Sequence, residues 1–181
     1  MRNSWSDQVM RAQDGDLAAF DSLARQFQDM AVGYAYALVG DFHLAQDVTQ
    51  EAFIQAYRKI DKLENPATFP GWLRRMVFKY ADRMKRKRPP PYVDIDDILD
   101  MASSDDTSET SSDELQHAVL EAVQMLPDPQ RIVTTLFYIE AYSHQEIASF
   151  LEVPNHTIDN RLRAARKHLK ERMMDMVKET L

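Results

Sequence analysis

The sequence of 181 residues contains no cysteine and only four glycines. Without cysteine the chain has no disulfide, no thiolate zinc site and no cysteine nucleophile. Alternation of apolar and polar residues, which is typical of strands, is scarce, so we expect an all-α fold. The longest apolar run, residues 30–40, is too short to span a bilayer, and no early stretch resembles a secretory signal. We therefore expect a cytoplasmic protein without membrane insertion.

Residue groupings that carry enzyme chemistry are also missing. The five histidines have no H-x-x-x-H or H-E-x-x-H spacing, which argues against a metal site. There is no glycine-rich phosphate loop, and the aspartate pairs at residues 96–97 and 105–106 lie where nothing would remove them from water. We expect neither enzyme activity nor a cofactor.

The net charge of −7 is divided unevenly along the chain. Residues 89–116 hold nine acids and no Lys or Arg, and the rest of the chain has 20 acids and 22 bases. Residues 74–88 hold eight bases and one acid, and residues 161–172 hold six bases and one acid. Because nucleic acid responds to the local field of a face, both basic stretches are candidate DNA-binding faces.

Apolar periodicity and helix-breaking residues predict two helical domains, residues 1–88 and 113–181. The flexible acidic linker between them, residues 89–112, begins with three prolines and has few side chains to bury. Gly40 is expected to end one helix, and Asp128 with Pro129 to begin another as N-cap and first helical residue. The expected helices lie near residues 5–10, over 17–39, 43–60 and 72–88, and from 113 and 128 onward, with a loop at 61–70 and with Val48, Ala52, Phe53, Ala56 and Tyr57 facing inward.

Residues 143–169 have the pattern of a helix-turn-helix. Ser143 and Glu146 have the spacing of a capping box, and the first helix must end near Pro154. A second helix from about Asn155 is apolar on one side and rich in Arg and Lys on the other. Such a helix can lie in the DNA major groove, although a helical hairpin with a solvated basic face has the same pattern.

Five collinear motifs make the chain resemble the extracytoplasmic-function (ECF) sigma factors, which belong to the sigma-70 family of bacterial RNA polymerase initiation factors. The resemblance covers nearly the whole chain and implies an N-terminal domain similar to sigma region 2 and a C-terminal domain similar to sigma region 4. The motifs are GDLAAFDSL at 15–23, AQDVTQEAFIQAY at 45–57, FPGWLRR at 69–75, LPDPQRIV at 126–133, and EIASFL with TIDNRLRAAR between 146 and 166.

The resemblance implies partners and positions for each domain. The helix around Asp47 resembles the segment that docks on the clamp helices of the largest subunit of core RNA polymerase, and the second domain would contact the flap of the second-largest subunit. Family members are often held inactive by an anti-sigma factor. The residues implied are Asp47, Gln50, Glu51, Phe53 and Ile54 for polymerase, then Asn65, Phe69, Trp72, Arg74, Arg75, Lys79 and Arg83 for −10 promoter DNA, and Asn155, His156, Thr157, Asp159, Asn160, Arg161, Arg163 and Arg166 for −35 promoter DNA.

Several of these assignments have alternatives. The loop at 61–69 resembles one that captures an extruded −10 base, with Asn65 and Phe69 as its polar and stacking groups, but a plain connector is equally compatible. Trp72 fits the core better than a stacking platform. Asp159 and Asn160 stand where the family commonly has Lys and Ser. An acid there repels phosphate unless it accepts from cytosine or pairs with Arg163.

Two other functions therefore stay open. One is a free-standing helix-turn-helix regulator that does not join polymerase, and the other is a sigma-like adaptor without promoter activity. A departure at Phe78–Lys79, where the family often has Arg-Asn, also bears on promoter choice.

Overall fold

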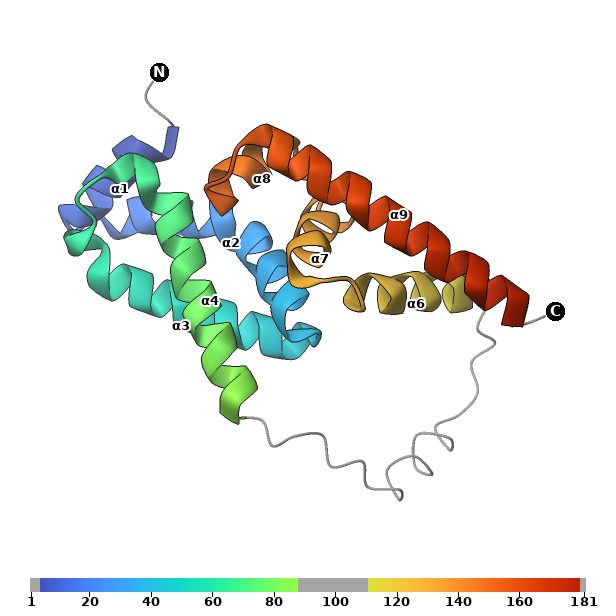
Figure 1. Cartoon of the computed structure of the whole chain (residues 1–181). Helices are drawn as coiled ribbons and strands as arrows, with labels where there is room; N and C mark the ends of the chain where they lie inside the picture. Colours follow the sequence, from blue (N-terminus) through green and yellow to red (C-terminus); the bar gives the residue numbers. More distant parts are fainter. Residues whose placement is uncertain (1–3, 88–110, 180–181) are drawn as a thin grey trace.

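The computed structural model describes residues 4–87 and 111–179, and every regular element in these ranges is a helix (Figure 1). The described part of the chain therefore agrees with the predicted all-α class. Residues 88–110, which include most of the predicted linker, lie outside the described residues. The first helix after them begins at Ser111, two residues earlier than predicted.

The N-terminal half is built from α1 (Ser4–Gln13), α2 (Leu17–Val39), α3 (Phe42–Lys59) and α4 (Phe69–Lys87). The carboxylates of Asp16 and Asp41 accept hydrogen bonds from the backbone amides three residues further on and so begin α2 and α3. Gly40, with φ of 75°, ends α2 in the left-handed conformation, as predicted.

The predicted loop at 61–70 is more ordered than expected. Two short 3-10 helices, η1 (Ile60–Lys62) and η2 (Pro66–Thr68), occupy half of it. Helix α4 begins at Phe69 rather than at Trp72. Pro70 does not prevent this, because in the first helical turn its missing N–H has no partner to lose.

The C-terminal half contains α6 (Ser111–Gln124), α7 (Asp128–Thr134), the π-helical turn η3 (Thr135–Ile139), α8 (His144–Leu151) and α9 (Asn155–Glu179). The predicted capping box of Ser143 and Glu146 is formed at the start of α8. The predicted N-cap at Asp128 is wrong by one residue. Pro127 takes that position, and the Asp128 carboxylate instead pairs with Arg131 inside the first turn.

One hydrophobic cluster lies wholly in the N-terminal half and joins α1, α2, α3 and α4. Val9, Leu23, Phe69 and Leu73 are fully buried there, and the partly buried Trp72 packs against them. This is the environment expected of a core tryptophan.

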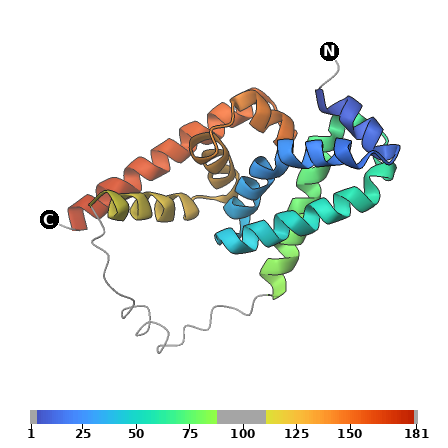
Figure 2. The same ribbon diagram turned by 180° about the vertical axis from the view of Figure 1, so that it is seen from behind.

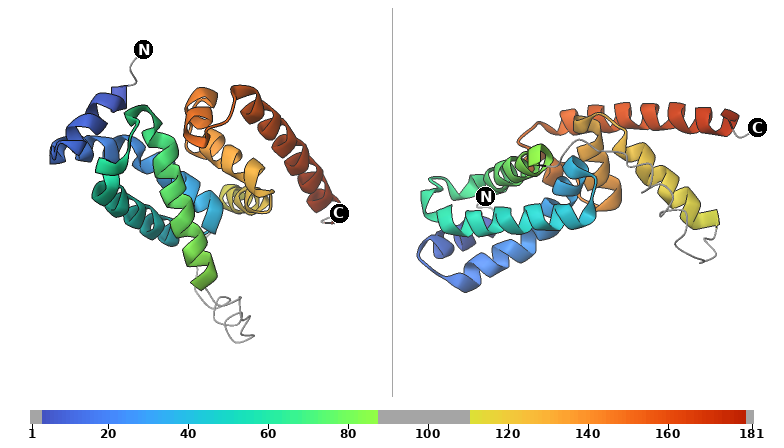
Figure 3. Two further views of the ribbon diagram at one scale, coloured as in Figure 1. Left: turned by 60° about the vertical axis from the view of Figure 1, so that its left-hand side comes forward. Right: turned by 90° about the horizontal axis from the view of Figure 1, so that it is seen from below.

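A second cluster spans both halves of the molecule. It joins Tyr34 and Val77 to Leu136, Phe150 and Ile158, and the Tyr34 and Phe150 rings meet edge to face at 5.5 Å. Helices α7 and α8 lie against the N-terminal half in Figures 1 and 2, whereas α6 and α9 extend away from it (Figure 3). The two predicted domains thus share a core, which the sequence did not predict.

Candidate functional site

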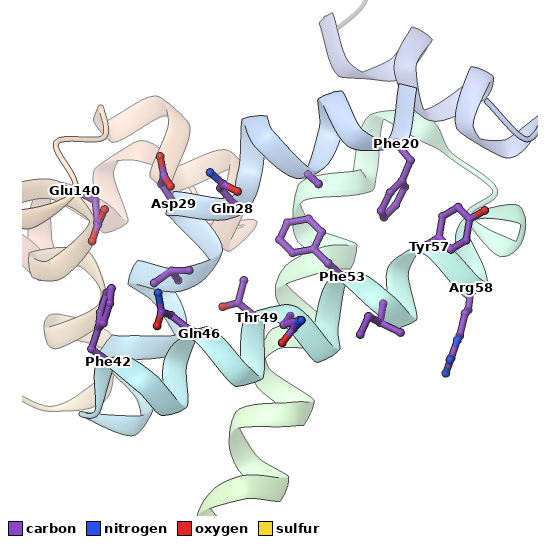
Figure 4. A pocket seen from close by; sticks show the side chains of 14 residues that line it. Phe20, Gln28, Asp29, Phe42, Gln46, Thr49, Phe53, Tyr57, Arg58 and Glu140 are labelled. Carbon is purple, nitrogen blue, oxygen red and sulfur yellow. The ribbon is translucent and has the colours of Figure 1, made fainter. Parts of the chain in front are cut away.

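Helix α3 presents the polar residues that the sequence singled out. Asp47, Gln50 and Glu51 are all exposed. Beside them a groove of about 970 Å³ runs between α2 and α3 (Figure 4). Its lining is predominantly aromatic and aliphatic, with Gln46, Gln50 and Arg58 among its polar members, and the apolar side chains are Phe20, Ala24, Val32, Phe42, Phe53, Ile54 and Tyr57.

Three side chains give this groove an apolar surface open to solvent. Phe42 is 54% exposed, Tyr57 47% and Ile54 37%. Tyr57 was expected to face inward, but it is exposed, and its ring packs edge to face on Phe20 at the groove wall, 5.1 Å away. Exposed apolar surface next to charged groups is typical of a surface that receives a partner helix.

Acidic groups from both halves meet at one end of the groove. Glu140 of the C-terminal half lies there with Asp29 of α2 (Figure 4). Burial, with a smaller contribution from Asp29, raises the pKa of the Glu140 carboxyl above its ordinary value of 4.5. Burial, followed by the charges of Asp29 and Glu140, also raises the pKa of Tyr142 to about 12.

The structure corrects one residue assigned to the −10 element. Phe69 is fully buried, with its ring 5.5 Å from that of Phe27 and 6.0 Å from that of Trp72. It therefore presents no face on which a base could stack. Asn65 is exposed, but its side-chain oxygen caps η2 by accepting from the amide of Ala67 at 3.1 Å, which leaves its amide NH₂ for a ligand.

The basic residues of α4 divide into paired and exposed groups. Lys79 and Arg83 are exposed. Arg74 and Arg75 both donate to one carboxylate oxygen of Glu152, at 2.8 and 2.6 Å, across the two halves of the chain. Glu152 ends α8 in a left-handed conformation with φ of 56°. The sequence did not indicate that it pairs with these arginines.

Helix α9 has the expected two-sided character. Ile158, Leu162 and Ala165 are buried. The predicted DNA-reading residues Asn155, His156, Asp159, Asn160, Arg163 and Arg166 are exposed, and Thr157 and Arg161 are half-buried.

Asp159 pairs with a residue that the sequence did not suggest. Its Oδ1 lies 2.8 Å from Nδ1 of His144, the first residue of α8. This contact joins both helices of the helix-turn-helix, whereas the sequence suggested Arg163 as one possible partner. Residues that are distant in sequence form this pair, so the i, i+4 rule could not identify it.

A second apolar groove, of about 870 Å³, lies on the C-terminal half between α6, η3 and α9, with Arg166 and Lys170 in its lining. The sequence patterns considered above did not predict this groove. A signal was present in three pairs of adjacent apolar residues, since two neighbours in a helix cannot both point into one core. These pairs are Val119 with Leu120, Tyr138 with Ile139, and Met173 with Met174, and all six side chains are exposed.

Within residues 4–87 and 111–179, no helix is long and apolar enough to cross a membrane. The same part of the chain holds no group of three His, Asp or Glu side chains that could bind a metal ion.

Comparisons with known proteins match both halves. Residues 23–89 match the family Sigma-70 region 2, and residues 116–169 match Sigma-70, region 4. The chain is 32% identical to the RNA polymerase sigma-H factor of Pseudomonas aeruginosa, with 94% of each covered. It is 30% identical to the ECF RNA polymerase sigma-E factor of Escherichia coli K12, with 98% of this chain and 100% of the relative covered. The solved structure of CnrH in complex with the cytosolic domain of CnrY has the same fold, with a TM-score of 0.65, 19% identity, and 96% and 99% of the two chains covered.

The chain belongs to the sigma-70 family of RNA polymerase sigma factors. Within that family it is an ECF sigma factor, like the relatives that it matches along almost its whole length. The predicted family is confirmed. Sigma factors are transcription initiation factors, and the relatives direct promoter-specific transcription. The predicted domain boundaries and the predicted site residues other than Phe69 stay predictions.

Proposed function

We propose that this chain docks on core RNA polymerase through α3 and contacts the two promoter elements with separate halves, α4 at −10 and α9 at −35. The proposal rests on two surfaces, one in each of the segments that match the sigma-70 regions. A charged face beside an apolar groove lies in region 2, and an exposed basic helix of a helix-turn-helix lies in region 4. Such a subunit would act in the cytoplasm, where polymerase and promoter DNA meet.

Polymerase docking is assigned to Asp47, Gln50 and Glu51 together with the groove residues Phe53 and Ile54. A clamp helix of the largest subunit can lay its apolar side chains into the groove while its polar ones meet the acids. The groove between α6 and α9 is the corresponding candidate for the flap of the second-largest subunit, since its lining is almost wholly apolar.

For the −35 element, the exposed side chains at the start of α9 are in position to reach base edges. Asn155 and Asn160 can pair with adenine, and Arg163 and Arg166 can contact guanine or phosphate. The Asp159–His144 pair holds the start of α9 to α8. This gives Asp159 a structural role in addition to any contact with cytosine.

For the −10 element, we propose phosphate contacts from Lys79, Arg83, Arg74 and Arg75, and a base contact from the amide of Asn65. Phosphate contacts contribute affinity without sequence preference and weaken as salt rises. Trp72 supports this face from the core, and Phe69 has no direct part in it.

An anti-sigma factor is a further proposed partner. CnrH is bound to the cytosolic domain of CnrY, and RpoE of Bartonella quintana is bound to the anti-sigma factor NepR. Both are structural neighbours of this chain, with TM-scores of 0.65 and 0.53.

Run-off transcription with purified core polymerase tests the proposal. Replacing Asp47, Gln50 and Glu51 together with Ala should abolish both capture of core polymerase and promoter-dependent transcript. The control replaces the exposed pair Asp21 and Arg25 of α2 with Ala and should retain both activities. A free-standing regulator would keep DNA binding and yield no transcript even as wild type, and an adaptor would capture core polymerase without transcript.

A further inference from the structure

We propose that the chain restrains its own DNA binding. Glu152 of the C-terminal half occupies Arg74 and Arg75 of α4, so these arginines hold either Glu152 or DNA phosphate. This inference rests on the proposed function of α4 as the −10 DNA face. It requires no partner chain, because both sides of the contact belong to this protein.

The ion pair imitates a phosphate contact. Oε2 of Glu152 accepts from Nη2 of Arg74 at 2.8 Å and from Nη1 of Arg75 at 2.6 Å. Two guanidinium groups that converge on one anionic oxygen are also the arrangement in which arginines bind a phosphate oxygen. The side chain of Arg74 is only 22% exposed, and its Nη2 is occupied by Glu152, so Glu152 and DNA phosphate compete for the same guanidinium group.

The pairing is strong enough to shift the titration of Glu152. Hydrogen bonding from Arg74 is the largest cause that lowers the pKa of this carboxyl below its ordinary value, and Arg75 adds to it. Glu152 therefore remains charged at neutral pH and competes with phosphate as an anion.

Two glycines of the N-terminal half make room for two glutamates of the C-terminal half. A Cβ atom at Gly71 of α4 would lie 2.3 Å from Cδ of Glu152, and one at Gly33 of α2 would lie 2.7 Å from Cγ of Glu140. Real Cβ atoms do not approach other atoms so closely. A Cβ atom at either glycine would force the glutamate side chain to move, so the halves fit together closely at two separate points.

The second of these points lies in the proposed polymerase groove. Glu140 lines the end of the groove between α2 and α3 (Figure 4). A clamp helix that enters the groove meets Glu140 and favours its removal from Gly33. Since Glu140 and Glu152 belong to the same half, polymerase docking and release of Arg74 and Arg75 are expected to favour each other.

Two variants test the restraint, one in each half of the contact: Gly71→Ala in α4 and Glu152→Gln at the end of α8. The Ala methyl occupies the place of the Glu152 carboxyl, and because Ala favours helix more than Gly does, α4 is not weakened. The Gln variant keeps the shape of the side chain and removes its charge. Glu121→Gln, on the exposed face of α6, removes the same charge elsewhere and controls for the change in net charge.

Two readouts are measured on the full chain. Fluorescence anisotropy gives the affinity for a duplex with an open −10 segment. Energy transfer between dyes on Leu17→Cys and Lys167→Cys reports the separation of the halves, and labelling is specific because the chain has no cysteine of its own. We expect both variants to bind DNA about five- to tenfold more tightly than wild type and to show lower energy transfer, with Glu121→Gln unchanged.

Equal affinity of wild type, Gly71→Ala and Glu152→Gln would overturn the restraint, whether or not energy transfer changes. Lys79→Ala with Arg83→Ala tests the proposed function separately, because neither residue contacts Glu152. If this double variant loses DNA affinity while the Glu152 variants gain none, only the restraint is wrong. If it retains full affinity, the assignment of α4 to DNA is wrong as well.

Discussion

The two halves of the molecule bury their side chains in different ways. The N-terminal half has a hydrophobic cluster of its own around Leu23, Phe69 and Leu73, whereas the large buried side chains of α8 belong to the cluster shared between the halves. Phe150 is fully buried in this shared cluster and packs edge to face on Tyr34 of α2. The N-terminal half can therefore keep its core when the halves part, but α8 would expose apolar surface that needs another cover.

This difference also assigns different roles to polar groups. In the N-terminal half, Asp16, Asp41 and Gly40 serve the helices in which they lie. In the C-terminal half, Arg131, Glu140 and Glu152 reach across to the other half. The contact between the halves is thus polar at its edges and apolar at its centre, which is the composition of an interface that can open.

The largest effect is expected from Phe150→Ala. It removes a fully buried ring from the shared cluster and should lower the free energy of unfolding by about 3–5 kcal/mol in a urea titration. Phe78→Ala is the control, since this phenylalanine of α4 is 52% exposed and should cost little. A loss below about 1 kcal/mol for Phe150→Ala would mean that α8 does not depend on the N-terminal half.

Arg131→Ala should have the next largest effect on stability. The guanidinium donates to the carbonyl oxygen of Ala37 across the interface and to those of Gln124 and Leu126 within its own half. Because these oxygens would lose a charged donor, we expect a loss of about 1–3 kcal/mol in thermal unfolding. Arg25→Ala breaks only an exposed pair and should change stability by less than about 1 kcal/mol, and an equal loss in both variants would contradict the proposed bridge.

Lys79→Ala with Arg83→Ala sharpens the comparison between the basic faces of α4 and α9. Since each lost phosphate contact reduces the salt dependence of binding by about one counterion, the slope of log K against log salt should fall by about two. Fluorescence anisotropy at several salt concentrations measures it. Arg11→Ala with Arg25→Ala removes the same charge from exposed sites on α1 and α2 and should leave the slope unchanged.

The smallest effect is expected from the pH dependence of the two interface glutamates. The pKa of Glu140 is raised, so its ionisation costs stability as pH rises above 4.5 toward the raised value. The pKa of Glu152 is lowered, so its contribution is present above 4.5 and is lost as pH falls through the lowered value. At pH 7, Glu140→Gln should therefore slightly raise the urea midpoint and Glu152→Gln should lower it. Shifts of the same sign in both variants would contradict these environments.

Local sequence signals predicted much of the fold. The capping box of Ser143 and Glu146, the left-handed Gly40 and the apolar side of α9 all depend on residues a few positions apart, and all three are formed. The error at Phe69 has a different origin. Its placement depends on Phe27 of α2, 42 positions away, which no local pattern specifies.

The sequence by itself determined the all-α class, the family and the position of the helix-turn-helix, because helix periodicity, caps and collinear motifs are properties of short segments. Only the tertiary structure decided which side chains meet between helices. Across the halves, Glu152 meets Arg74 and Arg75, and Glu140 lies over Gly33. Within the C-terminal half, His144 meets Asp159. The contacts across the halves join helices that are distant in the chain, and the packing of Tyr34 and Val77 on Phe150 and Ile158 brings them together. Hydrophobic packing is non-directional, so the sequence does not specify which apolar side chains will meet. The partners are known only when the helices are placed in space.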